Sequence, residues 1–297
     1  MGVVIPATDE TWQRLQALST LPRSASSAYW QDRRTEMAMQ RTGDAITFDG
    51  LYSDVPEAPG WLSPGRLSWL RRLVGVGDAR DWSEHPLTLA WRTRLHALPD
   101  PRLASVFSSY DLAKAEDTAA DLPDGPILEI GGGACLVAAA MLRRDCQRYA
   151  VIDLPESMAA GFAVLRWLFP AINIALPGEP NTGARVTFHT PDSMPDETFA
   201  AAVNVTSFQE LDPPIVAGYF VRLDDWLVPG GRFVCINRAV KTDPARNLHA
   251  VFEDYPWPEG WSVLRDDEPL ISRWSGPMTT IRRRVIQKPT TACAAKS

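Results

Sequence analysis

Cysteine is scarce in this sequence: its 297 residues include four, Cys135, Cys146, Cys235 and Cys293. No two of them form a CxxC pair or another spacing typical of metal ligands, so we expect reduced thiols. No apolar run reaches the ~18 residues of a membrane span. The first residues also lack the basic and apolar regions of a signal peptide. These absences predict a cytoplasmic protein without a membrane partner.

Positive charge is also limited, with 30 Lys and Arg against 36 Asp and Glu and a formal net charge of -6. Nucleic-acid binding relies on clustered basic residues, so we expect no nucleic-acid partner. The one basic run, Arg282 to Arg284, lies among apolar residues and is interpreted as the solvent-facing part of a strand. The 45% hydrophobic content is typical of a globular protein.

The first 123 residues contain helical patterns separated by turn-rich segments, with no alternation typical of strands. We expect helices at 11–21, 27–41, 64–74 and 86–98. This region is predicted to be a helical cap or lid that binds the substrate. The last residues, 289–297, are predicted to be a flexible tail.

Residues 124–288 alternate between apolar strand patterns and helical patterns. We expect strands at 126–130, 148–153, 184–189, 199–205 and 231–237, with two more at 261–264 and 279–286. Helices are expected at 134–144, 155–169 and 213–227, the last ending at Pro229-Gly-Gly231. This order predicts an α/β fold with a mostly parallel, seven-stranded, doubly wound sheet.

A glycine-rich turn, Gly131-Gly132-Gly133, follows the first of these strands. Glycines there let the backbone turn tightly and approach a ligand closely. A dinucleotide site needs Gly-x-Gly-x-x-Gly, but Leu136 stands where its last glycine would fall. An ordinary strand-to-helix turn is the alternative interpretation.

The segment resembles the first motif of class I S-adenosylmethionine-dependent methyltransferases, acidic-x-Gly-x-Gly-x-Gly. Glu129, Gly131 and Gly133 match the motif, whereas Cys135 replaces its last glycine. The resemblance implies a Rossmann-like fold and S-adenosyl-L-methionine as cofactor. It also implies that Glu129 and Gly131 to Gly133 belong to the cofactor site.

Asp153 ends the second strand, and an acid about 20 residues after the glycine motif can accept hydrogen bonds from ribose hydroxyls. Leu154 follows it in the predicted site. The resemblance places Asp192 and Ser193, after the third strand, near the adenine amine. It places Asn204, on the fourth strand, near the amino-acid end of the cofactor. Asp and Ser also occur in turns without any ligand.

Three further phrases resemble the putative sugar O-methyltransferases of bacterial glycan and natural-product pathways. They are Val151-Ile-Asp-Leu-Pro-Glu156, Asn204-Val-Thr-Ser-Phe-Gln-Glu-Leu211 and Cys235-Ile-Asn-Arg238, joined by Ser27-Ala-Tyr-Trp30 near the N-terminus. The resemblance covers residues 125 to 240 well and the N-terminal region thinly. It implies methyl transfer to a hydroxyl of a sugar-containing small molecule.

A sugar hydroxyl is a poor nucleophile, so a general base within hydrogen-bond reach is expected. Glu210 is the candidate base or acceptor-orienting group, Gln209 the candidate positioning group and His189 the second candidate base. Glu210 can instead serve only to favour the start of the following helix. A magnesium-assisted reaction would need carboxylates near the methyl group, and the pair Asp224-Asp225 is misplaced for this, so no metal is predicted.

Two alternatives remain open. The acceptor can be a polyketide, phenolic or amine natural product, since Asp-Leu-Pro is shared with those O-methyltransferases. The chain can also be a non-catalytic binding subunit, because a Cys135 side chain in the glycine loop can crowd the cofactor. The sequence leaves the oligomeric state undecided, with a homodimer among the options.

Overall fold

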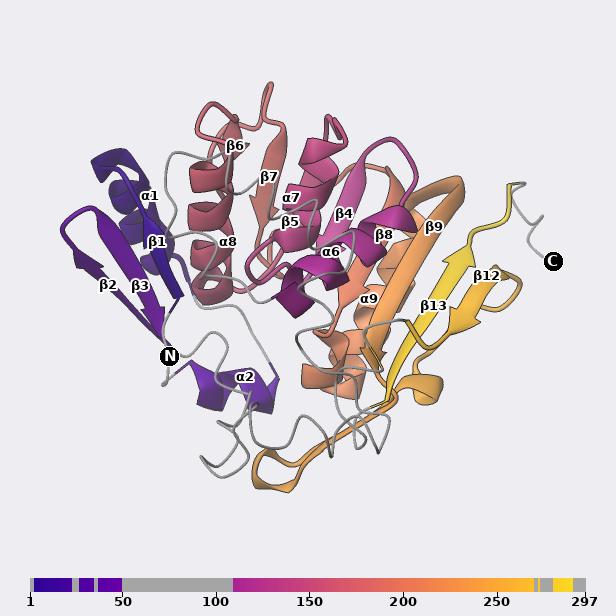
Figure 1. Ribbon diagram of the computed structural model, residues 1–297. Coiled ribbons are helices and arrows are strands. Elements are labelled where there is room, and N and C mark those ends of the chain that lie inside the picture. Colours follow the sequence, from indigo (N-terminus) through magenta and orange to yellow (C-terminus); the bar gives the residue numbers. More distant parts are fainter. Residues whose placement is uncertain are drawn as a thin grey trace, which may run out of the picture.

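The computed structural model describes residues 3–22, 27–34, 37–49, 109–269, 272 and 280–290. Its centre is an eight-stranded sheet in the order β12-β13-β9-β8-β4-β5-β7-β6 (Figure 1). The six strands from β9 to β6 are parallel, whereas β13 and β12 are antiparallel. The strands are β4 (Ile127–Ile130), β5 (Tyr149–Ile152), β6 (Ile174–Ala175), β7 (Val186–His189), β8 (Phe199–Val205), β9 (Leu227–Arg238), β12 (Ser262–Asp267) and β13 (Ile281–Gln287).

Helices cover both faces of the sheet. Helices α6 (Ser109–Ala120), α7 (Leu136–Arg143) and α8 (Pro155–Leu168) contribute to one hydrophobic cluster, and α9 (Pro213–Trp226) contributes to the other. Strand residues alternate between the two clusters, with Ile127 in the first and Leu128 in the second. The Rossmann-like α/β fold predicted from the sequence is therefore confirmed, with one short extra strand, β6.

Proline fixes two helix starts where the sequence predicts them. Pro155 and Pro213 occupy the first turns of α8 and α9, where the missing N–H costs no hydrogen bond. The predicted role of Pro229-Gly-Gly231 as a helix stop is wrong. Helix α9 ends at Trp226, and the three residues lie inside β9, at a bulge that shifts its register against β8.

The N-terminal region differs from the all-helical prediction. The structure has α1 (Asp9–Ser19) and the short α2 (Ala28–Arg33), together with a sheet of β1 (Val3–Pro6), β3 (Ala45–Asp49) and β2 (Ala38–Thr42). Within the predicted helix 27–41, residues 28–33 form α2, whereas residues 38–41 belong to β2. A two-residue hairpin turn, in which Gly43 adopts a φ of +61°, joins β2 to β3. The predicted helices 64–74 and 86–98 lie outside the described residues.

A small hairpin also extends the chain after β9. It consists of β10 (Val240–Asp243) and β11 (Leu248–Val251), which pair antiparallel. Short 3-10 turns at Pro244–Arg246 and Phe252–Asp254 lie within it and directly after it. The sequence pattern did not predict this hairpin.

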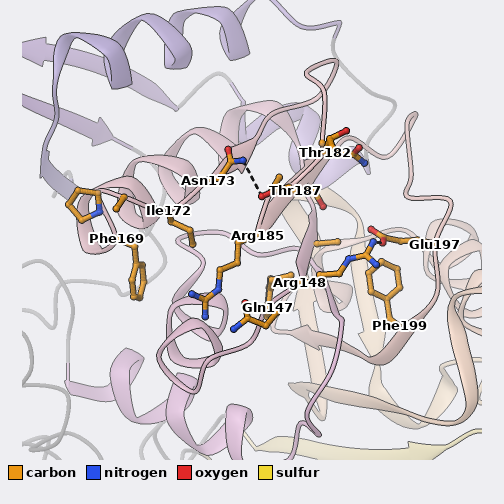
Figure 2. Close-up of a pocket in the computed structure, with 17 residues that line it drawn as sticks. Gln147, Arg148, Phe169, Ile172, Asn173, Thr182, Arg185, Thr187, Glu197 and Phe199 are labelled. Carbon is orange, nitrogen blue, oxygen red and sulfur yellow. Dashed lines mark hydrogen bonds and ion pairs between the residues drawn. The ribbon is translucent and has the colours of Figure 1, made fainter.

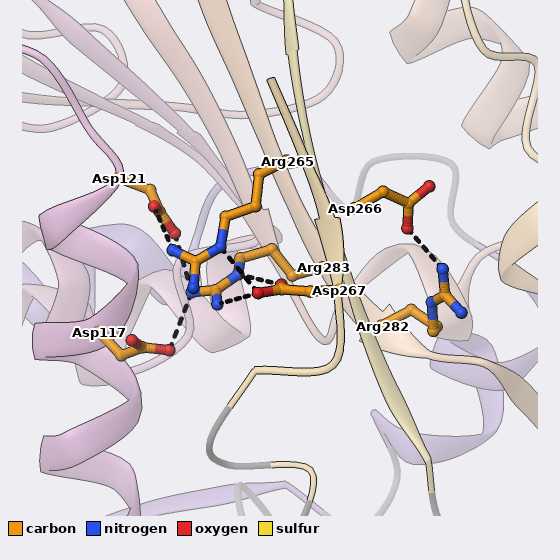
Figure 3. A network of polar contacts seen from close by, with 7 residues as sticks. All are labelled: Asp117, Asp121, Arg265, Asp266, Asp267, Arg282 and Arg283. Atoms are coloured by element: carbon orange, nitrogen blue, oxygen red, sulfur yellow. Dashed lines mark hydrogen bonds and ion pairs between the residues drawn. The ribbon is translucent and has the colours of Figure 1, made fainter. Parts of the chain in front are cut away.

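The run Arg282 to Arg284 is not the solvent-facing segment that the sequence predicts. Arg283 is only 1% exposed, and its guanidinium bonds Asp267 of β12 and both Asp117 and Asp121 at the end of α6 (Figure 3). Arg265 adds bonds to Asp121 and Asp267. Three carboxylates thus neutralise the buried guanidinium and tie α6 to the edge of the sheet.

Candidate active site

The glycine turn lies at the carboxyl end of β4, where an open α/β sheet binds its ligand. Gly131 has a φ of +75°, and a Cβ there would overlap the side chain of Ser207. Gly133 has a φ of +52°, and a Cβ there would have no atom of the described residues within 4 Å. Glycine is therefore required on the inner side of the turn, and the turn opens to free space at Gly133.

Asp153 lies beside this turn, at the end of β5. Its Oδ2 accepts a hydrogen bond of 2.7 Å from the Gly133 N–H, and its Oδ1 accepts one of 2.7 Å from the Leu154 N–H. Burial raises the pKa of Asp153 to about 6, although these two donors act in the opposite direction. The structure thus brings together Asp153, Leu154 and the glycine turn, as the sequence predicts.

Glu129 lies beneath the turn rather than on its open side. It is 2% exposed and accepts a hydrogen bond of 2.9 Å from Tyr149 Oη. Burial raises the pKa of Glu129 to about 8, so the side chain is largely protonated at neutral pH. Glu129 therefore supports the turn from within the core.

Cys135, which replaces the last glycine of the motif, adopts the left-handed conformation that this position requires, with a φ of +55°. Its side chain is fully buried and packs against Gly161 of α8, where a Cβ would overlap Sγ. The thiol consequently points into the core and does not crowd the open side of the turn. Gly161 is the partner that makes this departure possible, and the sequence pattern gave no sign of it.

Buried amides join the ends of β8, β4 and β9. Asn204 Nδ2 donates to Ile130 O at 2.8 Å, while Asn204 Oδ1 accepts from Asn237 Nδ2 at 2.8 Å. Gln209 Oε1 accepts from the Arg238 N–H at 2.8 Å. Asn204 and Gln209 were predicted to contact cofactor and substrate. Both side-chain amides form hydrogen bonds within the protein. These bonds hold the loop after β8 in place.

Glu210 lies in that loop and forms an ion pair with a lysine that the sequence analysis did not single out. Lys241 Nζ is 2.8 Å from Glu210 Oε1, and both side chains are largely buried. The lysine ammonium also lies 4.5 Å from the ring centre of Tyr29 in α2. The Glu210 charge contributes to raising the pKa of Asp153, which places the two carboxyl groups in one electrostatic environment.

The His189 ring hydrogen-bonds within its own strand and the loop that follows. Nδ1 is 3.3 Å from Ser193 O and must donate there, since a carbonyl accepts only. Nε2, 3.1 Å from Thr187 Oγ1, then accepts the threonine hydroxyl. Burial lowers the pKa of His189, so the ring is neutral at pH 7, and its one lone pair already has a donor. This arrangement disfavours His189 as a base.

Asp192 and Ser193 line a cavity of about 640 Å³ between the loop after β7 and helix α9. The wall opposite them includes Tyr219 and Arg222. Both predicted residues are exposed, so their polar atoms are accessible to a ligand. This cavity lies near Asp153, at the carboxyl ends of the parallel strands. The Asp153 charge is close enough to contribute to the raised pKa of Tyr219, which lines the cavity.

A second cavity, of about 910 Å³, lies on the opposite side of the sheet from the glycine turn, at the amino ends of the parallel strands (Figure 2). Its lining comes from the amino ends of β5, β7 and β8 and includes Arg148, Arg185 and Glu197. Arg148 is paired with Glu197 across this cavity. Ligands of open α/β sheets bind at the carboxyl ends of the strands, so we assign no role in the reaction to this cavity.

Within the described ranges, no cluster of three or more His, Cys, Asp or Glu side chains is placed to hold a metal ion. In the same part of the chain, no helix is both long enough and apolar enough to cross a membrane.

Comparisons with known proteins found no matching family model and no matching curated protein. Solved structures similar to this chain include the glycopeptide N-methyltransferase MtfA, with 15% identity, a TM-score of 0.44 and coverage of 59% of this chain and 95% of that one. The pyocyanin biosynthetic protein PhzM has 14% identity, a TM-score of 0.44 and coverage of 76% and 68%. The N-methyltransferase NodS from Bradyrhizobium japonicum WM9 has 14% identity, a TM-score of 0.43 and coverage of 61% and 97%. Similarities this low leave the function to be argued from the residues of this chain.

Proposed function

We propose that this protein is an S-adenosylmethionine-dependent methyltransferase. The observation that carries the proposal is the carboxyl group of Asp153 held against the Gly133 N–H, at the carboxyl ends of two adjacent parallel strands. A carboxylate in this place can accept hydrogen bonds from both ribose hydroxyls of a nucleoside. The free space at Gly133 fits the close approach of a ligand to the backbone.

The other predicted site residues are compatible with the same cofactor. Asp192 and Ser193 present exposed polar atoms to the cavity next to α9, where an adenine amine can be bound. The amides of Asn204 and Gln209 keep the loop after β8 in place, which bounds the site on its other side. Glu129 and Cys135 shape the turn from below.

When bound, the cofactor supplies an electrophilic methyl group. The protein must then align an acceptor atom with that methyl, which by itself can lower the barrier by several kcal/mol. Glu210 is the carboxylate that we place on the acceptor side, because it lies in the loop after β8 and its pairing with Lys241 fixes the position of its side chain. We propose that the acceptor is a hydroxyl of a sugar or glycosylated small molecule, on the strength of the phrases around Asp153 and Glu210.

An acceptor of another kind, a polyketide, phenol or amine, remains the second candidate for the same reaction. A non-catalytic binding subunit is the third. It loses its main support because Cys135 is buried against Gly161 and does not obstruct the turn.

Calorimetric titration and thermal shift with S-adenosylmethionine and S-adenosylhomocysteine test the cofactor. We expect micromolar binding of both and a rise in Tm, because a ligand that binds only the folded state stabilises it. ATP and NAD serve as matched controls, since each has the same adenosine but not the methionine part. Binding of NAD without binding of either sulfur compound would exclude a methyltransferase.

A further inference from the structure

Helix α2 contacts the loop after β8 through its first residues. Ser27 Oγ donates a hydrogen bond of 2.7 Å to Glu210 O, and the Ala28 N–H donates one of 3.3 Å to Asp212 Oδ2. Ser27 is fully buried. This end of α2 therefore lies on the carboxyl side of β8, in contact with the backbone of Glu210.

The other end of α2 reaches the start of α8. Arg34 Nε lies 3.1 Å from Glu156 Oε1, and Glu156 follows Asp153 by three residues. Strand β4 separates β8 from β5, so two strand spacings of about 4.8 Å each lie between the two contact points. Seven helical steps from Ser27 to Arg34 cover roughly 10.5 Å. The helix thus matches the span across the glycine turn, and Figure 1 shows it at the lower ends of the parallel strands.

We propose that the segment Ser27–Arg34 is a strap that covers the cofactor slot and must undock for the cofactor product to leave. This inference rests on the proposed function, because it assigns a cover to the proposed S-adenosylmethionine site. The strap also positions Glu210. Its Tyr29 ring packs on the Lys241 ammonium that holds the Glu210 carboxylate. Closure of the strap therefore covers the cofactor and orders the acceptor side in one step.

The described contacts of the strap are suited to reversible docking. They are hydrogen bonds, ion pairs and cation–ring contacts, including Asp32 with Arg246 at 2.8 Å and the Arg246 guanidinium 5.4 Å from the Tyr29 ring centre. Tyr29 is buried but belongs to neither hydrophobic cluster of the core. Segments held mainly by polar contacts open at lower free-energy cost than segments anchored in an apolar core.

The test measures the dissociation rate of S-adenosylhomocysteine in stopped-flow displacement experiments. The double variant Asp32→Asn, Arg34→Gln removes one ion pair at each side of the strap and leaves Glu210 and Asp153 intact. Since each such pair is expected to change an equilibrium by a factor of about 1.5 to 5, dissociation should be about 2- to 25-fold faster. The control Arg148→Gln breaks an ion pair at the amino ends of the parallel strands, away from the strap, and should leave the dissociation rate unchanged.

Hydrogen exchange of the wild-type protein gives a second readout that needs no variant. Amides of 28–34 should exchange more slowly with S-adenosylhomocysteine bound, whereas those of the hairpin turn at 43–44 should not change. A wild-type protein that binds no S-adenosylhomocysteine would refute the proposed function and the strap together. A wild-type protein that binds it, with equal dissociation rates in all variants and no protection of 28–34, would refute the strap alone.

Discussion

Asp153 must be ionised to accept hydrogen bonds from two ribose hydroxyls, and burial raises its pKa to about 6. Affinity for S-adenosylhomocysteine should therefore be constant above about pH 7 and fall about tenfold per unit below pH 6. Asp153→Asn should weaken binding about 10- to 100-fold at pH 7.5 and remove this pH dependence. Calorimetry from pH 5 to 8 measures both effects. Asp192→Asn serves as the control and should keep the pH dependence, so an unaltered profile in Asp153→Asn would assign the titration to another group.

Glu210 is the carboxylate that we place on the acceptor side. Glu210→Gln keeps the shape and removes the charge, so turnover on an accepted substrate should fall at least ~100-fold while affinity for S-adenosylhomocysteine stays the same. His189→Gln is the matched control and should retain most of the turnover, because both ring nitrogens already have partners. Loss of turnover in the histidine variant alone would reverse the two assignments.

At the scale of elements, helix α8 packs closely against the start of α7 because Gly161 has no side chain. A Cβ at Gly161 would overlap Cys135 Sγ and lie 2.7 Å from Gly133 O. Gly161→Ala should lower the free energy of unfolding by about 1–3 kcal/mol, as overpacking of a core does. The double variant with Cys135→Gly should recover part of the loss, because the sulfur is gone. Urea denaturation measures both.

Gly218 in α9 provides the control for that substitution. A Cβ there would meet no atom of the described part of the chain within 4 Å, so Gly218→Ala should be neutral or stabilise by up to about 1 kcal/mol through helix propensity. Equal losses at Gly161 and Gly218 would show that the effect is not due to contact with Cys135.

The same elements show what the sequence can and cannot predict. The strands β4, β5, β7 and β8 and the starts of α8 and α9 follow from local apolar runs and proline, so the sequence predicts them well. The glycine turn and Asp153 follow from strand ends that the fold brings together. The contacts of Cys135 with Gly161 and of Glu210 with Lys241 join residues 26 and 31 positions apart, and no local pattern encodes such pairs. The N-terminal sheet was missed because its strands lack continuous apolar runs: no residue of β2 is buried, and only two residues of β3 are.

On the scale of the whole molecule, Arg283 joins parts of the chain that the sequence keeps far apart. It lies on β13, yet it bonds Asp117 and Asp121, 166 and 162 positions earlier. A basic run in sequence is ambiguous because alternate residues of a strand face opposite sides of the sheet. Here one of the three arginines is buried among carboxylates, and that outcome depends on where α6 packs.

Removing the Arg283 guanidinium should leave Asp117, Asp121 and Asp267 with Arg265 alone. Arg283→Met should therefore lower the free energy of unfolding by about 3–5 kcal/mol at pH 7, the usual cost of breaking a buried ion pair from one side. Arg282→Met, one residue away and 30% exposed, should cost about 0–1 kcal/mol. Urea denaturation compares the two.

Acid should reduce the loss of stability that Arg283→Met causes relative to the wild type. Burial alone would raise the pKa of Asp267, but hydrogen bonds from Arg283 and Arg265 outweigh it and hold the pKa below the ordinary 3.8. A carboxyl whose pKa is depressed by folding contributes stability above its unfolded pKa and loses it as the pH falls through the folded one. Burial raises the pKa of Asp117, the other way from Asp267, so Asp117 is protonated first as the pH falls. The gap between Arg283→Met and wild type should thus be full near pH 7 and be mostly lost below about pH 4. A gap that persists at pH 3 would mean that the arginine stem, packed in the core, and not its charge accounts for the stability.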